Sequence, residues 1–138
     1  RVLIQAFATE HPAIQAAATH DPVPFYDREL HLRKVMAYPP WVALTQVRVQ
    51  DRNALRGESA ARRVAERLRA ASGGRYAVLG PAPAPLVKLK GEYRYQILVK
   101  GKSRAAMARG IREVLDSMEA SRDLPAICVV ETDPRSLL

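Results

Sequence analysis

The chain has 138 residues, of which 48% are hydrophobic, so it can form a domain with a hydrophobic core and is not composed like a disordered chain. Its formal net charge of +8 favours an anionic partner such as nucleic acid. The absence of an apolar run of roughly 20 residues predicts a cytoplasmic protein with no membrane partner. The single cysteine, Cys128, excludes an internal disulfide and lies in an apolar run, where a thiol is a small buried hydrophobe.

The first part of the chain is typical of the end of a preceding domain. Val2 to Phe7 predicts a short strand, and the alanine-rich stretch Ala13 to Ala18 predicts a helix. A strand that starts so abruptly suggests that its neighbours lie upstream. Pro22 and Pro24 then mark a boundary. We therefore expect residues 1–20 to be the trailing end of another domain and residues 21–41 to be a helical linker.

The linker itself has a helical pattern. Apolar residues from Phe25 to Met36 recur at helical intervals, and Glu29 precedes Arg33 by four residues, the favourable order for an ion pair. The run Tyr38-Pro39-Pro40-Trp41 ends this helix, because two prolines cannot continue it and the residue before a proline is pushed toward extended geometry.

Residues 42–138 predict the order βαββαβ. Period-two alternation indicates strands, and capping residues before periodic apolar stretches indicate helices. The strands are expected at Ala43–Gln50, Tyr76–Leu79, Tyr93–Val99 and Leu124–Glu131, and the helices from the caps Asp51 or Asn53 to Ala71 and from the cap Ser103 to Met118. Between the second and third strands, Gly80 to Pro85 predicts a stiff extended loop rather than a hairpin turn.

This order is that of an α+β, ferredoxin-like domain with a four-stranded antiparallel sheet and both helices on one face, here preceded by a strand and helix extension. The first and third strands are neighbours at the centre of such a sheet. Tyr93 and Tyr95 are expected to face the core, which disfavours base stacking on exposed aromatic rings. The other face is then polar and cationic, with Gln46, Arg48, Arg94 and Gln96.

The stretch from Pro85 to Arg104 has six lysine and arginine side chains and a single acidic one, Glu92. Lys88 and Lys90 are expected in a loop that enters the sheet, a position that suits phosphate contacts. The candidate DNA-contacting residues are Lys88, Lys90, Arg94, Lys100, Lys102 and, from the neighbouring strand, Arg48.

Residues that carry catalysis or bind metal ions are not apparent. The three histidines, His11, His20 and His31, have no metal-ligand spacing with one another or with Cys128. No phosphate-binding glycine loop, nucleophile elbow or pair of catalytic carboxylates is present. We expect no active site, metal site or cofactor in this segment.

Five motifs in order nevertheless resemble a known family. They lie from the predicted linker to the end of the last strand, and the resemblance covers nearly the whole chain. The family is the bacterial primosomal replication-restart helicase PriA (primosomal protein N′), in its C-terminal part with the end of its second helicase lobe. The motifs are Phe25-Tyr26 with Glu29-Leu30 and Arg33, Tyr38-Pro39-Pro40-Trp41, Gly80-Pro81-Ala82-Pro83, Tyr93-Arg94-Tyr95-Gln96 and Asp133-Pro134.

The resemblance implies a parent protein that is an ATP-dependent DNA helicase acting on forked DNA, whose ATP, Mg and Zn sites lie upstream of this segment. The segment would be a module that docks forked or single-stranded DNA and other primosome proteins. It also implies that Arg104 binds the acidic C-terminal tail of single-stranded DNA-binding protein. The family pattern can place a glutamine one turn later, where this chain has Ala108.

Two other functions share the βαββαβ order, a small-molecule sensor and an RNA-binding domain. A sensor binds its ligand at a dimer interface and has no need of a cationic loop. A measurement of how binding depends on salt separates the docking module from the sensor.

Overall fold

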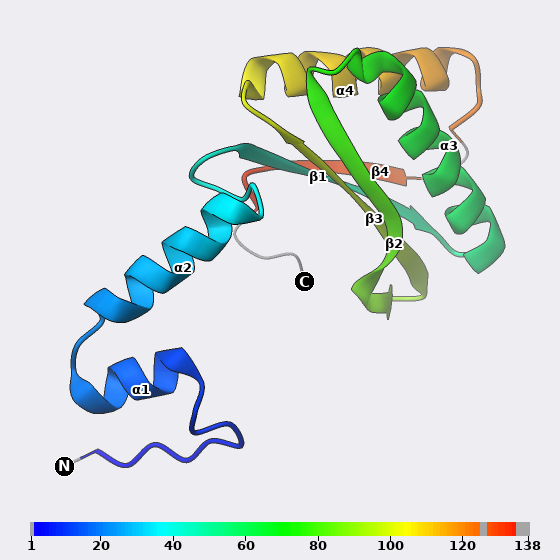
Figure 1. Cartoon of the computed structure of the whole chain (residues 1–138). Helices are drawn as coiled ribbons and strands as arrows, with labels where there is room; N and C mark the ends of the chain where they lie inside the picture. Colours follow the sequence, from blue (N-terminus) through cyan, green and yellow to red (C-terminus); the bar gives the residue numbers. More distant parts are fainter. Residues whose placement is uncertain (1, 125–126, 135–138) are drawn as a thin grey trace. The chain divides into compact units, whose positions relative to one another are not determined.

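The structure is a computed structural model that describes residues 2–124 and 127–134. The chain consists of two compact units, Arg1–Ala37 and Tyr38–Leu138. The first contains two helices, α1 (Pro12–Thr19) and α2 (Val23–Val35), and the second contains all the strands of the described residues (Figure 1).

The first unit confirms the predicted helices but not the predicted strand. In α2, Arg33 Nε lies 2.8 Å from Glu29 Oε1, which is the expected ion pair. The segment Val2 to Phe7 is not a strand, and its large apolar side chains are exposed. A strand needs a neighbour to accept its hydrogen bonds, and the strands of the described residues all lie in the sheet of the second unit. The assignment of residues 1–20 to a helicase lobe stays a prediction.

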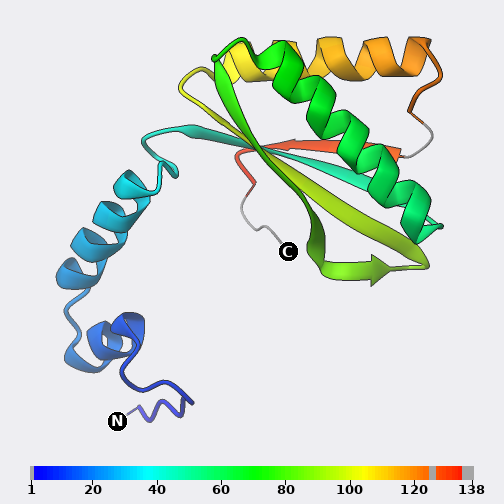
Figure 2. The ribbon, with the colours of Figure 1, turned by 45° about the vertical axis from the view of Figure 1, so that its right-hand side comes forward.

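The second unit is the predicted ferredoxin-like domain. Its elements are β1 (Ala43–Asp51), α3 (Ala54–Ser72), β2 (Tyr76–Leu89), β3 (Glu92–Gly101), α4 (Arg104–Ala120) and β4 (Ile127–Thr132). The four strands form one antiparallel sheet in the order β2-β3-β1-β4, with β1 and β3 at its centre. Both helices cover the same face (Figures 1 and 2). Residues 125 and 126 of the predicted last strand lie outside the described residues.

Local residue choice explains where the helices begin and end. The Asn53 side chain accepts a hydrogen bond from the Arg56 N–H, and the Ser103 hydroxyl accepts one from the Ala106 N–H, so each helix has the N-cap predicted for it. Helix α3 ends at Gly73, whose φ of 52° is left-handed and suits glycine.

The core lies between the helices and the sheet. Alternate residues of the central strands meet apolar residues that recur every three or four positions along the helices. Its fully buried members include Val47, Val49, Ile97 and Val99 from the sheet and Val64, Leu68, Met107 and Met118 from the helices. Tyr95 is also buried, and its hydroxyl donates a hydrogen bond to the Ala54 carbonyl at 3.0 Å. The predicted inward orientation of Tyr95 is therefore confirmed.

The proline-rich segment differs from the prediction of a loop. It belongs to β2, where Ala82 pairs with Gln96 and Pro83 pairs with Tyr95. The pairing is interrupted twice, between Leu79 and Ala82 and between Pro83 and Lys88. Proline is tolerated here because β2 is an edge strand of the sheet, where alternate backbone nitrogens point away from the neighbouring strand.

Candidate nucleic-acid interface

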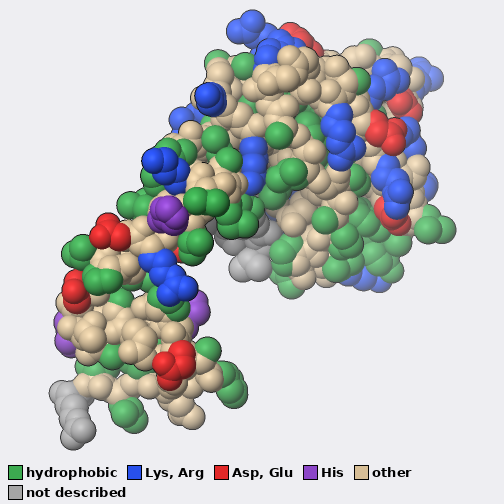
Figure 3. Space-filling view, in the orientation of Figure 1, with side chains coloured by type: hydrophobic (Ala, Val, Ile, Leu, Met, Phe, Trp, Pro, Cys, Tyr) green, Lys and Arg blue, Asp and Glu red, His purple; other side chains and the backbone are tan. Residues whose placement is uncertain are grey.

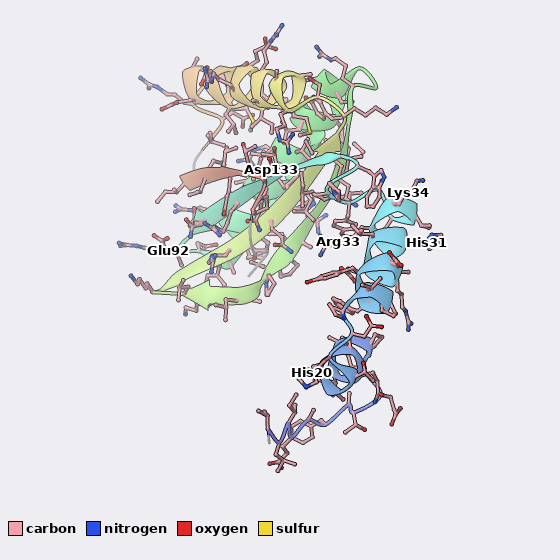
Figure 4. All side chains as sticks on the ribbon, turned by 90° about the vertical axis from the view of Figure 1, so that its left-hand side faces the viewer. His20, His31, Arg33, Lys34, Glu92 and Asp133 are labelled. Carbon is pink, nitrogen blue, oxygen red and sulfur yellow. The ribbon has the colours of Figure 1, made fainter. Side chains whose placement is uncertain are left out.

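The two loop lysines lie at the turn between β2 and β3. Lys88 belongs to β2 rather than to a loop, opposite Tyr93, and its Nζ lies 4.9 Å from the centroid of the Tyr93 ring. Lys90 is in the turn itself, with a φ of 51°, and is exposed. Glu92, which is labelled in Figure 4, lies at the end of the sheet that carries this turn. The turn therefore presents two cations on a hairpin tip.

Lys100 and Lys102 lie at the other end of β3. A strand rises about 3.3 Å per residue, so the two ends of this ten-residue strand are about 30 Å apart. The Lys100 Nζ lies 3.6 Å from the centroid of the Tyr38 ring, while Lys102 is exposed after the strand ends. The cationic stretch of the sequence therefore forms two groups in space rather than one patch.

Arg48 and Arg94 lie on the face of the sheet opposite the helices. The register places Arg48 opposite Gln96 and Gln50 opposite Arg94. On the same face, Gln46 Nε2 donates a hydrogen bond to Gln96 Oε1 at 3.0 Å. The four predicted residues of the open face, Gln46, Arg48, Arg94 and Gln96, are thus brought together.

The exposure of Arg94 differs from the prediction. An open sheet face suggested a solvated side chain, but Arg94 is only 5% exposed. The cause lies in β2, where residues 84–87 have no paired partner and stand opposite this single residue of β3. A bulge in the neighbouring strand cannot be read from the alternation of β3, so the sequence predicted the face of Arg94 but not its burial.

Arg104 begins α4, as predicted, but it already has a carboxylate partner. Its Nε lies 2.6 Å from Oδ2 of Asp133, which lies below the N-terminal end of α4 in Figure 4. The Asp133 N–H donates to the Leu44 carbonyl at 2.8 Å, which fixes the carboxylate beside the helix. The hydrogen bond from Arg104 lowers the pKa of Asp133. In the sequence, Asp133 stands out only as part of an Asp-Pro motif, and nothing in that motif indicates its contact with Arg104.

The arginines of α3 are mostly paired with acidic side chains. Arg62 contacts Glu58, and Arg63 and Arg67 both contact Asp123, at distances between 2.6 and 3.7 Å. Figure 3 accordingly shows acidic side chains beside several of the lysine and arginine side chains on that side of the molecule. This helix therefore has less unpaired charge than its composition suggests.

No group of three or more His, Cys, Asp and Glu residues within 2–124 and 127–134 is arranged to hold a metal ion. His20 and His31 lie on separate segments of the first unit (Figure 4). Burial raises the pKa of the Cys128 thiol to about 11. None of the described helices is long and apolar enough to cross a bilayer.

The decisive comparison is with protein families. Residues 34–135 match the family model described as the primosomal protein N C-terminal domain. The chain belongs to this family. The resemblance predicted from the five sequence motifs is thereby confirmed.

Curated relatives of this family member carry the name replication restart protein PriA. The protein from Bacillus subtilis is 31% identical over 83% of this chain, and the one from Thermotoga maritima is 32% identical over 99%. A probable replication restart protein PriA from Deinococcus radiodurans is 32% identical over 98%. The chain spans only 14–17% of the length of these three relatives, so it corresponds to one part of a longer protein in each of them.

Among solved structures, the de novo designed protein Foldit4 matches this family member with a TM-score of 0.51. The match covers 69% of this chain and 99% of the designed one, at 14% sequence identity. Identity this low shows similarity of fold alone.

Proposed function

We propose that this domain docks forked or single-stranded DNA for a replication-restart protein through contacts with the phosphate backbone. The observation that carries the proposal is a set of cations without acidic partners. Among the described residues, none of the following forms an ion pair: Arg48, Lys88, Lys90, Arg94 and Lys102. Family membership and the net charge of +8 support the same function.

Binding of this kind depends little on base sequence. Lysine and arginine contacts to phosphate fix a strand in place but do not read its bases. Stacking of bases would need aromatic rings on the free face of the sheet, and Tyr95 is buried on the other face. A sequence-independent DNA contact is therefore favoured over an RNA-binding domain that reads bases.

The proposal includes a second partner, the acidic C-terminal tail of single-stranded DNA-binding protein, which contacts Arg104. This part is supported by the pairing of Arg104 with the Asp133 carboxylate at 2.6 Å, because a group that holds one carboxylate in this geometry suits another. The parent protein would be an ATP-dependent helicase working with other primosome proteins, with its ATP, Mg and Zn in parts of the protein outside this chain.

The test is a titration of the 138-residue chain with single-stranded and forked DNA at several salt concentrations. Affinity should fall steeply with salt, because each neutralised phosphate releases counterions. The double variant Lys88→Ala, Lys90→Ala should flatten the slope by about one to two. The matched control is Arg109→Ala, Arg112→Ala, which removes the same charge from exposed positions on α4.

Absence of binding at low salt would refute the proposed function. Equal flattening in both double variants would show that only total charge matters and that the hairpin tip is not a contact site.

A further inference from the structure

Arg94 is a nearly buried cation without a partner. It is 5% exposed, it makes no side-chain hydrogen bond or ion pair within the described residues, and its Nε is fully buried. A charged group removed from water is costly unless an opposite charge and hydrogen bonds replace its hydration. The position of Arg94 is therefore one that an anion would stabilise.

The neighbours of Arg94 on the open face have the same property. Arg48 Nε and Gln46 Oε1 are also buried, with no hydrogen-bond partner among the described residues. Because Arg48 pairs with Gln96, two residues after Arg94, the two arginines are diagonal neighbours whose Cα atoms are roughly 7–8 Å apart. Two long, flexible side chains at that spacing can both reach one small anion.

This face is not covered by the two helices, although Arg94 and Gln46 on it are buried. The helices pack against the other face of the sheet (Figure 2). Within residues 2–124 and 127–134, the two Nη nitrogens of Arg94 donate no hydrogen bond, and they keep some contact with solvent. Arg48, Gln50 and Gln96 around them are half-buried. A group approaching from solvent would meet these half-buried side chains first, and it would reach Arg94 through the small part of its guanidinium group that stays exposed.

The two acidic side chains on the same face do not neutralise Arg48 and Arg94. Glu92 lies two residues before Arg94 in β3, and Glu131 lies opposite Gln46 in β4. Neither forms an ion pair with an arginine in the part of the chain that the structure describes. The charge on Arg48 and Arg94 is thus available to an external anion.

We infer that Arg48 and Arg94, with the amide of Gln96, form a subsite that binds one phosphate group of a DNA strand lying across the open face. A carboxylate has two oxygens, and a single guanidinium group can donate hydrogen bonds to both. A phosphate has more acceptor oxygens than that. Phosphate is therefore the better match to two guanidinium groups beside an amide. The inference rests on the proposed function and adds to it a defined position for the strand, distinct from the hairpin tip.

The first experiment measures thermal stability with and without inorganic phosphate at constant ionic strength. Arg94→Met keeps the apolar stem and removes the charge, so it should melt above the wild type without phosphate. Phosphate should raise the melting temperature of the wild type, because it binds the folded state, but not that of Arg94→Met or Arg48→Met. The control Arg112→Met removes an exposed α4 charge and should respond to phosphate like the wild type.

The second experiment measures binding of a fluorescent single-stranded oligothymidylate. Arg94→Met should weaken binding about tenfold and reduce the salt slope by about one, with a much smaller effect of Arg112→Met. Arg94→Lys should recover only part of the affinity, because an ammonium group lacks the planar fork of guanidinium.

The outcomes separate this inference from the proposed function. No oligothymidylate binding by the wild type would refute the proposed function. Binding that Arg94→Met, Arg48→Met and Arg112→Met weaken equally would leave the proposed function standing and overturn the inference. A lower melting temperature of Arg94→Met without phosphate, or stabilisation of all three variants by phosphate, would also overturn it.

Other outcomes would assign the site to another ligand. Stabilisation by inorganic phosphate, with oligothymidylate binding unchanged in Arg94→Met and Arg48→Met, would assign the site to free phosphate instead of DNA. Preferential binding of an acidic peptide would assign it to protein.

Discussion

Arg104 Nε lies 2.6 Å from Asp133 Oδ2, so the cation proposed for an external carboxylate already holds an internal one. The side chains of Arg104 and Asp133 are 66% and 39% exposed, which leaves the pair open to exchange. Asp133 is held beside α4 by its backbone bond to Leu44. An acidic tail that binds Arg104 must therefore compete with Asp133.

We predict that Asp133→Asn strengthens binding of an acidic peptide with a free C-terminus, while Arg104→Ala weakens it about tenfold, as expected for a lost charged hydrogen bond. Fluorescence anisotropy of a labelled peptide measures both effects, and the amidated peptide is the control. If neither substitution changes affinity, the tail binds elsewhere. If both weaken binding, Asp133 orients Arg104 rather than competing for it.

Two buried tyrosines, Tyr76 and Tyr95, allow the contribution of one side-chain hydrogen bond to stability to be measured. The Tyr95 hydroxyl donates to the Ala54 carbonyl, whereas the Tyr76 hydroxyl has no hydrogen-bond partner in the part of the chain that the structure describes. Tyr95→Phe should lower stability by about 1 kcal/mol. Tyr76→Phe should leave stability unchanged or raise it, since it removes a buried hydroxyl whose loss of hydration is not offset by a hydrogen bond. Urea denaturation of both variants tests this, and equal losses would contradict it.

Arg94 and Tyr95 are adjacent residues on opposite faces, and their truncations should differ in sign. Tyr95→Ala empties a core position and should cost about 3 kcal/mol or more. Arg94→Met should not cost stability, for the reasons given for the phosphate subsite. Thermal melts of the two variants compare them directly. A larger loss for Arg94→Met than for Tyr95→Ala would mean that the assignment of faces is wrong.

Asp51 links the end of β1 to the start of α3 and should make stability depend on pH. The Asp51 carboxylate accepts a hydrogen bond from the Asn53 N–H at 2.7 Å and pairs with Arg56 at 3.0 Å. These contacts, led by the bond from Asn53, lower the pKa of Asp51. The stability it contributes is then present above the unfolded pKa, about 3.9, and is lost as the pH falls below that value.

The measurement is the difference in unfolding free energy between the wild type and Asp51→Asn. It should be largest at neutral pH, at about 1–3 kcal/mol, and should shrink as the pH falls toward 2. A difference that does not change with pH would mean that the charge of Asp51 is not involved.

Cys128 should react slowly in the folded protein. Its pKa of about 11 leaves roughly one thousandth of the thiol ionised at pH 8, and the thiolate is the reactive form. Alkylation by iodoacetamide, followed by mass spectrometry, should therefore speed up about tenfold for each unit of rising pH below 11. Unfolding in urea should remove most of this protection. Fast alkylation of the folded chain at pH 8 would contradict the burial of the thiol.

Much of the fold could be predicted because it is encoded locally. Alternation in β1 and β3, the Asn53 and Ser103 caps and the Gly73 helix end each depend on a few adjacent residues. Their combination in one order was sufficient to predict the ferredoxin-like topology.

The contacts that were not predicted join distant parts of the chain. The bulge of β2 buries Arg94, and Asp133 pairs with Arg104 from 29 residues away. A sequence pattern shows that each arginine is cationic and which face or end it occupies. It does not show which neighbour arrives there after folding, and that neighbour determines whether the charge is solvated, paired or buried alone.

The prolines of β2 give the two edges of the sheet different chemistry. Pro81, Pro83 and Pro85 cannot donate backbone hydrogen bonds, so β2 is a poor template for another strand. The β4 edge has no proline between Ile127 and Thr132 and carries exposed Val129 and Val130. An additional strand, whether from a fused domain or from an aggregating copy, would therefore extend the sheet beside β4. In designing fusions or truncations of this domain, β4 is the edge to shield with a charged residue.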